Sequence, residues 1–330
     1  MGSGLAISAL GTSRLNRAAS KNPPSEQESS ITDSQLLSLN ATTAKTIEPI
    51  ATNFETITLD PGGQIISRPQ KQAQYFLENL SQGIALEMIV IPSGTFLMGA
   101  AEGEKSSYTD SDKPQHSVSV NSFYIGKYPI TQAQWRVIAS LPKIERDLNP
   151  DPSHFKGDDL PVERVSWYEA QEFCARLTQY SGKKYQLPSE AQWEYACRGG
   201  TTTPFYFGPT ITGQVANYLA SEGPYAVEAT GEFRKSTTRV GSFPPNNFGL
   251  YDLHGGVYEW CADPWHKNYD GAPTDDSVWL SDNAKDNRYR ILRGGGWATE
   301  ARQCRSAQRT RFGPDNKYST IGFRVVVIPA

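Results

Sequence analysis

Residues 240–265 read VGSFPPNNFGLYDLHGGVYEWCADPW, and this stretch shows which kinds of fold the chain can form. It has closely spaced Gly, Pro and Asn residues with isolated aromatic side chains, and the chain after Gly200 has few long periodic apolar runs. About 130 residues of loop and short strand exclude a Rossmann fold, a β-sandwich and a helix bundle. We therefore expect an α+β domain that is loop-rich, with few helices and short antiparallel strands.

Three helices are predicted upstream of this region. Each begins with a Ser or Thr before an apolar-periodic run, and a Glu or Gln follows three residues later, which is the capping-box pattern. The glycines after Arg198 predict that the third helix ends there. The three pairs are Thr131 with Gln134, Ser166 with Glu169 and Ser189 with Gln192.

Two of these helices carry a cysteine on their apolar side. In the second helix, Cys174 shares one stripe with Phe173 and Leu177, so we interpret it as a core residue. In the third helix, Cys197 lies beside Trp193 in the same kind of pattern. The alternative for Cys174 is a reactive thiol.

The N-terminal part of the chain is predicted to contain an arm and a hairpin. Residues 1–52 are rich in Ser, Thr, Asn, Gln and Ala, so we expect a poorly ordered arm or linker. The run FETITLDPGGQII (54–66) predicts two short strands around an Asp-Pro-Gly-Gly turn. We assign this hairpin to an extension at 53–72.

The main domain is placed at 73–330. Its first strand is predicted at IALEMIVI (84–91), a near-continuous apolar run that is stopped by Pro92 and Gly94. Buried strands of this length read as unbroken apolar runs.

Composition limits the classes of partner and the compartment. The net charge of −3 does not favour nucleic acid or an anionic membrane as the partner. No apolar run of about 18 residues predicts a membrane span, and no signal h-region is evident. Four widely spaced cysteines without a CxxC pair favour a reducing, cytoplasmic location over a zinc or disulfide framework.

A series of phrases in collinear order over residues 84–328 resembles the formylglycine-generating-enzyme family, also called the sulfatase-modifying-factor domain. The resemblance implies a modified C-type-lectin fold, in which N- and C-terminal strands pair beside each other. The phrases are IPSGTFLMG (91–99), FYIGKYPITQAQW (123–135), LPVERVSWYEAQEFC (160–174), YQLPSEAQWEYACRGG (185–200), the stretch 240–265 quoted above, RILRGGGW (290–297) and IGFRVV (321–326).

The resemblance also implies structural calcium, an ion that prefers carboxylate and carbonyl oxygens. The family pattern falls on the side chains of Asp252 and Glu259 and on the carbonyls of Gly255 and Val257. A second site in the family would begin at Asn217 and Tyr218, with Glu232 and Arg234 less securely aligned. The alternative for the first set is a hydrogen-bonded turn without a metal.

The catalytic cysteine pair of the family is incomplete in this chain. Its enzymes use two cysteines near the end of the domain to bind copper, which requires two soft sulfur ligands close together. The first position is Cys304, but the second is Arg309, and a guanidinium is permanently charged and cannot bind a metal. We therefore expect no copper and no formylglycine-generating activity, and Cys304 is either a buried structural residue or a reactive thiol.

A separate histidine-rich iron site, as in the ergothioneine-pathway relatives, is not expected either. The four histidines are scattered, and no two have the i, i+4 spacing of a helical metal face. They are His116, His154, His254 and His266.

The segment 298–320 has the pattern of a diversified surface. It keeps CRSA (304–307) and PDN (314–316), but other residues stand at positions that are commonly Asn in bacterial members of this branch. This resembles the variable proteins of diversity-generating retroelements, in which adenine-specific mutagenesis rewrites Asn codons; ordinary drift in a surface loop is the alternative. The positions are Ala298, Thr299, Glu300, Gln303, Gln308, Thr310, Phe312, Gly313, Tyr318, Ser319 and Thr320.

We therefore predict a non-catalytic binding protein that meets a protein or other macromolecule through 298–320. Such a surface combines aromatic anchors with small adaptable side chains. The alternatives are a formylglycine-generating oxidoreductase and a regulatory scaffold domain. The arginines at 290, 293, 302, 305, 309 and 311 could favour an anionic ligand, but we expect most of them to pair with nearby carboxylates.

Overall fold

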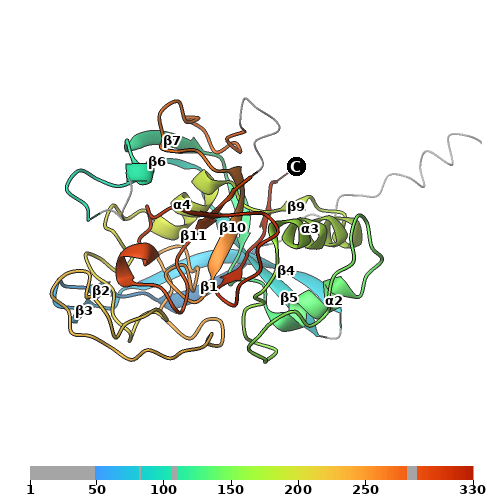
Figure 1. Ribbon diagram of the computed structural model, residues 1–330, viewed down its shortest axis with the longest axis horizontal. Helices are drawn as coiled ribbons and strands as arrows, with labels where there is room; N and C mark the ends of the chain where they lie inside the picture. Colours follow the sequence, from blue (N-terminus) through green and yellow to red (C-terminus); the bar gives the residue numbers. More distant parts are fainter. Residues whose placement is uncertain (1–48, 82, 106–109, 281–287, 330) are drawn as a thin grey trace, which may run out of the picture. The chain divides into compact units, whose positions relative to one another are not determined.

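The apolar run at Ile84–Ile91 forms β5, a central strand of a six-stranded antiparallel sheet in the computed structural model (Figure 1). Every second residue of the neighbouring strand β4 from Phe76 to Leu80 is buried, as a sheet with one covered face requires. The strands follow the order β1 (Ile50–Glu55), β4 (Gln70–Ser81), β5, β8 (Phe123–Gly126), β14 (Val326–Val327) and β9 (Tyr185–Gln186).

The structure describes residues 49–81, 83–105, 110–280 and 288–329. Most of the predicted arm, residues 1–48, lies outside them. The C-terminal strand β14 joins the sheet that contains β5, but it pairs with β8 and β9. The expected direct pairing of N- and C-terminal strands is therefore wrong by one strand, because β8 lies between β5 and β14.

The N-terminal hairpin has the predicted turn but wider boundaries. Strands β2 (Thr58–Leu59) and β3 (Ile65–Ser67) pair around it, and the Gly63 N–H donates to the Asp60 carbonyl at 3.0 Å. Strand β1 already begins at Ile50 and pairs with β4 over six residues. Because β4 also pairs with β5, β1 and β4 belong to the central sheet, whereas β2 and β3 form a separate two-stranded sheet.

Two further sheets complete the strand content. A four-stranded sheet has the order β12 (Thr310–Phe312), β11 (Arg290–Arg293), β10 (Tyr258–Pro264) and β13 (Ile321–Gly322). Its pairs are antiparallel apart from β10 with β13, which is parallel. Strands β6 (Gly94–Met98) and β7 (His116–Val120) form an antiparallel pair, drawn at the top of Figure 1.

All three predicted helix starts are confirmed as capping boxes. In each, the Ser or Thr side chain accepts the N3 backbone N–H, and the N3 side chain accepts the N-cap N–H. Gly199 ends the third helix with a φ of 54°, the left-handed conformation that glycine adopts at low cost. The helices are α2 (Gln132–Ala139), α3 (Trp167–Ser181) and α4 (Glu190–Arg198), with short 3-10 turns η1 (Asp110–Asp112) and η2 (Ala301–Cys304).

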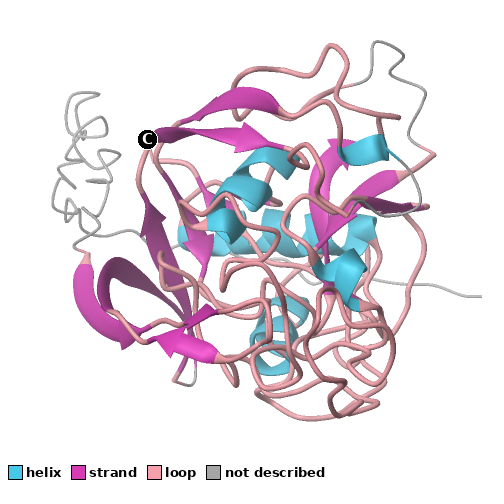
Figure 2. Cartoon of the chain, turned by 90° about the vertical axis from the view of Figure 1, so that its left-hand side faces the viewer, coloured by secondary structure: helices cyan, strands magenta, loops and turns pink. Residues whose placement is uncertain are grey.

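Large aromatic side chains fill the core and hold the loops, which make up most of the chain in Figure 2. Trp135 stacks on Phe173, and the indole of Trp260 donates to the Val165 carbonyl at 3.0 Å. Cys174 and Cys197 are buried as predicted, and burial raises the pKa of both thiols. Among the described residues, no helix is both long enough and apolar enough to span a bilayer.

Candidate functional site

The predicted surface segment divides into two accessible stretches and a buried turn. Residues 298–300 and 302–303 are half-buried, and residues 310–320 are half-buried or exposed except for the buried Pro314. Tyr318 is the most exposed of the predicted variable positions that are large and apolar, at 48%. Residues 304–309 are all buried. We call 298–303 together with 310–320 the display surface, and 304–309 the buried turn.

The prediction that Gln308 belongs to the surface positions is wrong. It lies in the buried turn with 4% of its surface exposed. Its carbonyl oxygen accepts from the Arg305 guanidinium at 3.1 Å, and its amide donates to the Arg309 carbonyl. A side chain held on both sides inside the protein cannot meet a partner, so Gln308 is structural.

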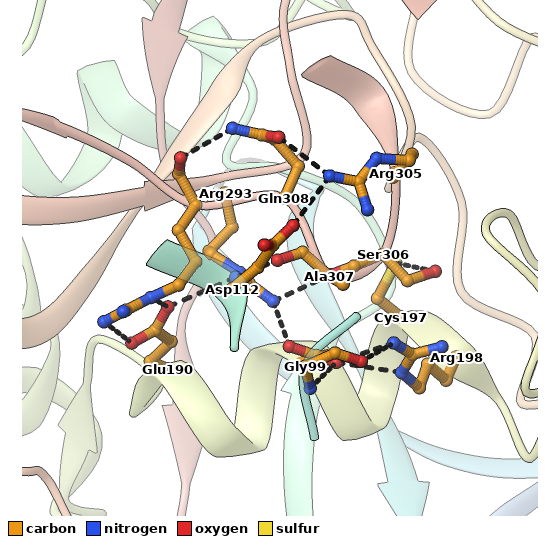
Figure 3. Close-up of polar contacts among 12 residues, drawn as sticks. Gly99, Asp112, Glu190, Cys197, Arg198, Arg293, Arg305, Ser306, Ala307 and Gln308 are labelled. Carbon is orange, nitrogen blue, oxygen red and sulfur yellow. Dashed lines mark hydrogen bonds and ion pairs between the residues drawn. The ribbon is translucent and has the colours of Figure 1, made fainter. Parts of the chain in front are cut away.

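Three buried arginines hold the turn, and much of their network is drawn in Figure 3. Arg305 pairs with Asp112 at 2.7 Å and with Glu104. Arg293, from β11, donates to the carbonyls of Ser306 and Ala307 and pairs with two carboxylates of α4. These carboxylates are Glu190 and Glu194.

Arg309 is held on both sides of its guanidinium. Its Nε and one terminal nitrogen bind the two oxygens of Glu190 at 2.7 and 2.9 Å. The other terminal nitrogen donates to the Ser111 carbonyl at 2.7 Å, and the group lies over the Tyr269 ring at 4.2 Å. The position of the second catalytic cysteine is therefore taken by a buried, bidentate ion pair.

The remaining arginines near the segment are also engaged. Arg302 pairs with Glu300 at the surface. Arg290 lies over the Trp167 ring at 4.0 Å, and Arg311 lies over Trp265 at 4.9 Å. The expectation that most of these arginines pair with carboxylates is confirmed for Arg293, Arg302, Arg305 and Arg309.

Cys304 is closed off from solvent. It is 0% exposed, and its Sγ lies 3.6 Å from the Thr299 hydroxyl. Burial raises the pKa of its thiol to about 12. Gly295 makes this packing possible, because a Cβ there would lie 2.5 Å from the sulfur. All four cysteines are free thiols in the part of the chain described.

Three of the four predicted calcium ligands line a small void of about 10 Å³, which is room for about one water-sized atom. They are Asp252, Gly255 and Val257, and Asn217 lines the void with them. One oxygen of Asp252 accepts the Gly241 N–H at 2.7 Å. Burial raises the pKa of this carboxyl to about 6, so its charge is poorly compensated.

Asn217, which lines the void, also has an unpaired side-chain oxygen. Its amide nitrogen donates to the Ser236 carbonyl, but its Oδ1 is buried and has no hydrogen-bond partner. An unpaired carbonyl oxygen beside a buried carboxylate suits a hard cation such as calcium. The void therefore fits the implied ion.

Glu259, the fourth predicted ligand, is engaged elsewhere. Arg324 binds both of its oxygens, at 2.6 and 2.7 Å, and the Trp193 indole donates to one of them at 2.8 Å. The carboxylate is thus neutralised by a guanidinium and does not line the void.

Three residues of the second predicted calcium set have other partners or are exposed. The Arg234 guanidinium donates to the carbonyls of Ala216 and Gly213, while Glu232 is exposed. The carbonyl of Tyr218 accepts the Ala220 N–H. Of this set, Asn217 alone lines the void, which belongs to the first predicted calcium site.

An aromatic cluster beside the display surface was missed at the sequence level. Trp297 stacks on Phe233 at 5.9 Å and meets the edge of Phe155 at 5.4 Å, and all three side chains are half-buried. Its indole donates to the Ser319 carbonyl at 2.9 Å. The spacing of these residues along the chain carries no signal of the contact.

Comparisons with known proteins agree with this architecture. A family model described as "sulfatase-modifying factor enzyme 1-like domain" matches residues 76–328. The chaperone protein LppX of Paenibacillus barcinonensis is 30% identical over 271 residues, which cover 69% of this chain and 86% of LppX.

Two solved structures have the same fold. PvdO from Pseudomonas aeruginosa is 31% identical, with a TM-score of 0.64 over 77% of this chain and 98% of PvdO. Variable protein 1 of Treponema denticola is 24% identical, with a TM-score of 0.63 over 77% of this chain and 99% of that protein. The chain therefore belongs to the sulfatase-modifying factor enzyme 1-like family and has its formylglycine-generating-enzyme type of C-type-lectin fold.

Proposed function

We propose that this family member is a non-catalytic binding protein that presents the display surface to a macromolecular partner. The observation that carries the proposal is the buried ion pair between Arg309 and Glu190, which stands where the family's enzymes need a second sulfur. A guanidinium stays protonated and cannot bind copper.

The state of Cys304 supports the same conclusion. Metals and oxygen chemistry require the thiolate, but burial raises the pKa of this thiol to about 12. The sulfur also lies under Gly295 and beside Thr299, without exposure to solvent. A single thiol also cannot supply the pair of sulfur ligands that the family's copper site requires.

The display surface has the composition of a binding face. It combines Tyr318 and Phe312, which pack against each other at 5.3 Å, with small polar residues. Aromatic anchors with few rotatable bonds and small adaptable neighbours are typical of binding loops. The buried turn behind them keeps the backbone in place while outward side chains change.

We further propose that variation at the display surface is programmed by a retroelement, with Gln308 excluded from the exposed set. The nucleotide sequence 3′ of the coding region tests this. A near-identical repeat that differs at adenines, beside a reverse-transcriptase gene, is expected. Its absence would leave ordinary drift as the origin of the variation.

The void beside Asp252 is proposed as a structural calcium site. Asp252, Asn217 and the main-chain carbonyls of Gly255 and Val257 would hold the ion, with Glu259 outside the ligand set. Calcium would compensate the buried carboxylate and stabilise the loops around it.

A direct assay separates the binding protein from an oxidoreductase. The purified chain is incubated with copper, oxygen and a peptide containing Cys-x-Pro-x-Arg, and aldehyde is detected by hydrazide labelling and mass spectrometry. An active formylglycine-generating enzyme is the positive control. We expect no aldehyde above the level without protein, and copper-dependent turnover would overturn the proposed function.

A further inference from the structure

The turn that borders the void is bonded directly to the residues just before the display surface. The Gly255 N–H donates to the Gly294 carbonyl at 2.7 Å. The Trp297 N–H donates to the Gly256 carbonyl at 2.8 Å, one residue before the first displayed position. Backbone bonds of this kind fix where Ala298 emerges.

The same turn holds the middle and the end of the segment. The Tyr258 N–H donates to the Thr320 carbonyl at 2.7 Å. The Nδ1 of His254 lies 2.6 Å from the Cys304 carbonyl. Because the other ring nitrogen accepts the Tyr206 N–H at 3.0 Å, Nδ1 is the protonated nitrogen and donates this bond.

Residues 252–258 thus contact residues in or next to the display surface and the buried turn at four points. The contacted residues are Gly294, Trp297, Cys304 and Thr320. Short loops without a ladder of their own open easily unless such contacts restrain them. These contacts restrain the chain just before the display surface, at the start of the buried turn and at the last displayed residue, so the order of residues 252–258 contributes to the order of the display surface.

Asn217 is bonded to the turn as well. Its main-chain carbonyl accepts the Gly256 N–H at 2.7 Å. The residue lines the void together with Asp252, and its side-chain Oδ1 is buried without a hydrogen-bond partner. Asp252 itself has a φ of 59°, a conformation that costs free energy in a residue other than glycine. A cation between these two side chains would join a strained turn to its neighbour.

We infer that a divalent cation held by Asp252 and Asn217 controls how rigidly the display surface is presented, through the four contacts of residues 252–258. This rests on the proposed function only in that the segment is taken as the binding surface. Cation binding stabilises the ordered turn by mass action. The four contacts pass this order to segments more than thirty residues away in sequence.

Hydrogen–deuterium exchange of the full chain tests the inference without a partner. The exchange is measured in CaCl2, in MgCl2 and in EDTA, and followed by mass spectrometry of peptides. In calcium, we expect slower exchange in peptides that cover 252–258 and also in those that cover 294–304 and 318–322. A change confined to 252–258, or no change, would overturn the inference.

Variants identify the residues that transmit the effect. Asp252→Asn keeps an oxygen for the Gly241 N–H but removes the charge, and we expect it to lose at least tenfold in calcium affinity and to lose the exchange response. Asp147→Asn, at an exposed carboxylate outside the display surface, is the matched control and should respond as the unmodified chain does.

The side-chain contact is tested separately. His254→Gln removes the ring bond to the Cys304 carbonyl, so the response around 304 should shrink while that around 297 and 320 remains. If either variant fails to fold, the exchange of the unmodified chain in calcium and in EDTA still tests the inference. Because no partner or substrate is present, this result is independent of the aldehyde assay that tests the proposed function.

Discussion

At the scale of single residues, burial separates the positions that can vary from those that cannot. Gln308 and Gln303 are five residues apart and chemically identical, but Gln308 is held in the buried turn while Gln303 is half-buried at the surface. The sequence alone does not distinguish them. The role of Gln308 depends on Arg305, which binds it, and on the carboxylates that orient this arginine.

The comparison of Gln308 with Gln303 gives the first prediction. Gln308→Ala should lower the free energy of unfolding by about 1–3 kcal/mol, since it leaves buried partners unpaired. Gln303→Ala should change it by no more than about 0.5 kcal/mol. Urea unfolding followed by tryptophan fluorescence measures both, and equal effects would contradict the division of the segment.

The ion pair of Arg309 gives the second prediction. Arg309→Met should cost about 3 kcal/mol, because Glu190 then loses its bidentate partner and keeps the Arg293 guanidinium and the Tyr269 hydroxyl. Arg302→Met breaks a pair in which both side chains are more than a third exposed, and should cost less than about 1 kcal/mol. A smaller loss for Arg309→Met than for Arg302→Met would show that the buried pair does not hold the turn.

Glu163 gives a prediction about pH. One of its oxygens accepts the N–H groups of His154 and Phe155, the other has no partner, and burial raises the pKa of the carboxyl to about 7. The unfolded chain loses this proton near its ordinary pKa of about 4.5, whereas the folded chain keeps it until about pH 7. The group therefore lowers stability progressively as the pH rises from about 4.5 to 7.

Glu163→Gln removes this titration and keeps the accepting oxygen. Relative to the unmodified chain, the variant should gain on the order of 2 kcal/mol between pH 4.5 and pH 8. Thermal unfolding at the two pH values measures the difference. A gain that is independent of pH would contradict the assignment.

At the scale of elements, local patterns determined the helices and the central strand. The capping boxes at Thr131, Ser166 and Ser189 and the apolar run of β5 depend on residues close in sequence, so they could be read directly. The start of β1 could not be predicted in this way, because the register of β1 is set by β4, some twenty residues downstream. The same holds for β14, which β8 separates from β5.

The cap of α3 provides a test at this scale. The Ser166 hydroxyl accepts the Glu169 N–H at 3.2 Å and donates to its carboxylate at 2.9 Å. Ser166→Ala should cost about 1 kcal/mol. Ser181→Ala, in the last turn of the same helix, should cost less than half as much, and a reversed order in thermal unfolding would contradict the role of the cap.

At the scale of the whole molecule, distant segments build the binding face. The buried turn is held by Glu190 and Asp112, which are 119 and 193 residues from their arginines in sequence. Asn217 likewise reaches the turn at Gly255 and Gly256. The family resemblance located the segment and the missing sulfur. The carboxylate that holds Arg309 and the pairing of Glu259 with Arg324 could be found only in the folded chain.

The most direct measurement of the central claim compares two libraries of equal size on the surface of yeast. One randomises five positions of the display surface, and the other randomises residues 305–309 of the buried turn. Folded display after heating is scored by protease resistance. We predict that most members of the first library stay as resistant as the unmodified chain while most of the second are cleaved; equal loss in both would contradict the claim that a fixed turn supports a replaceable surface.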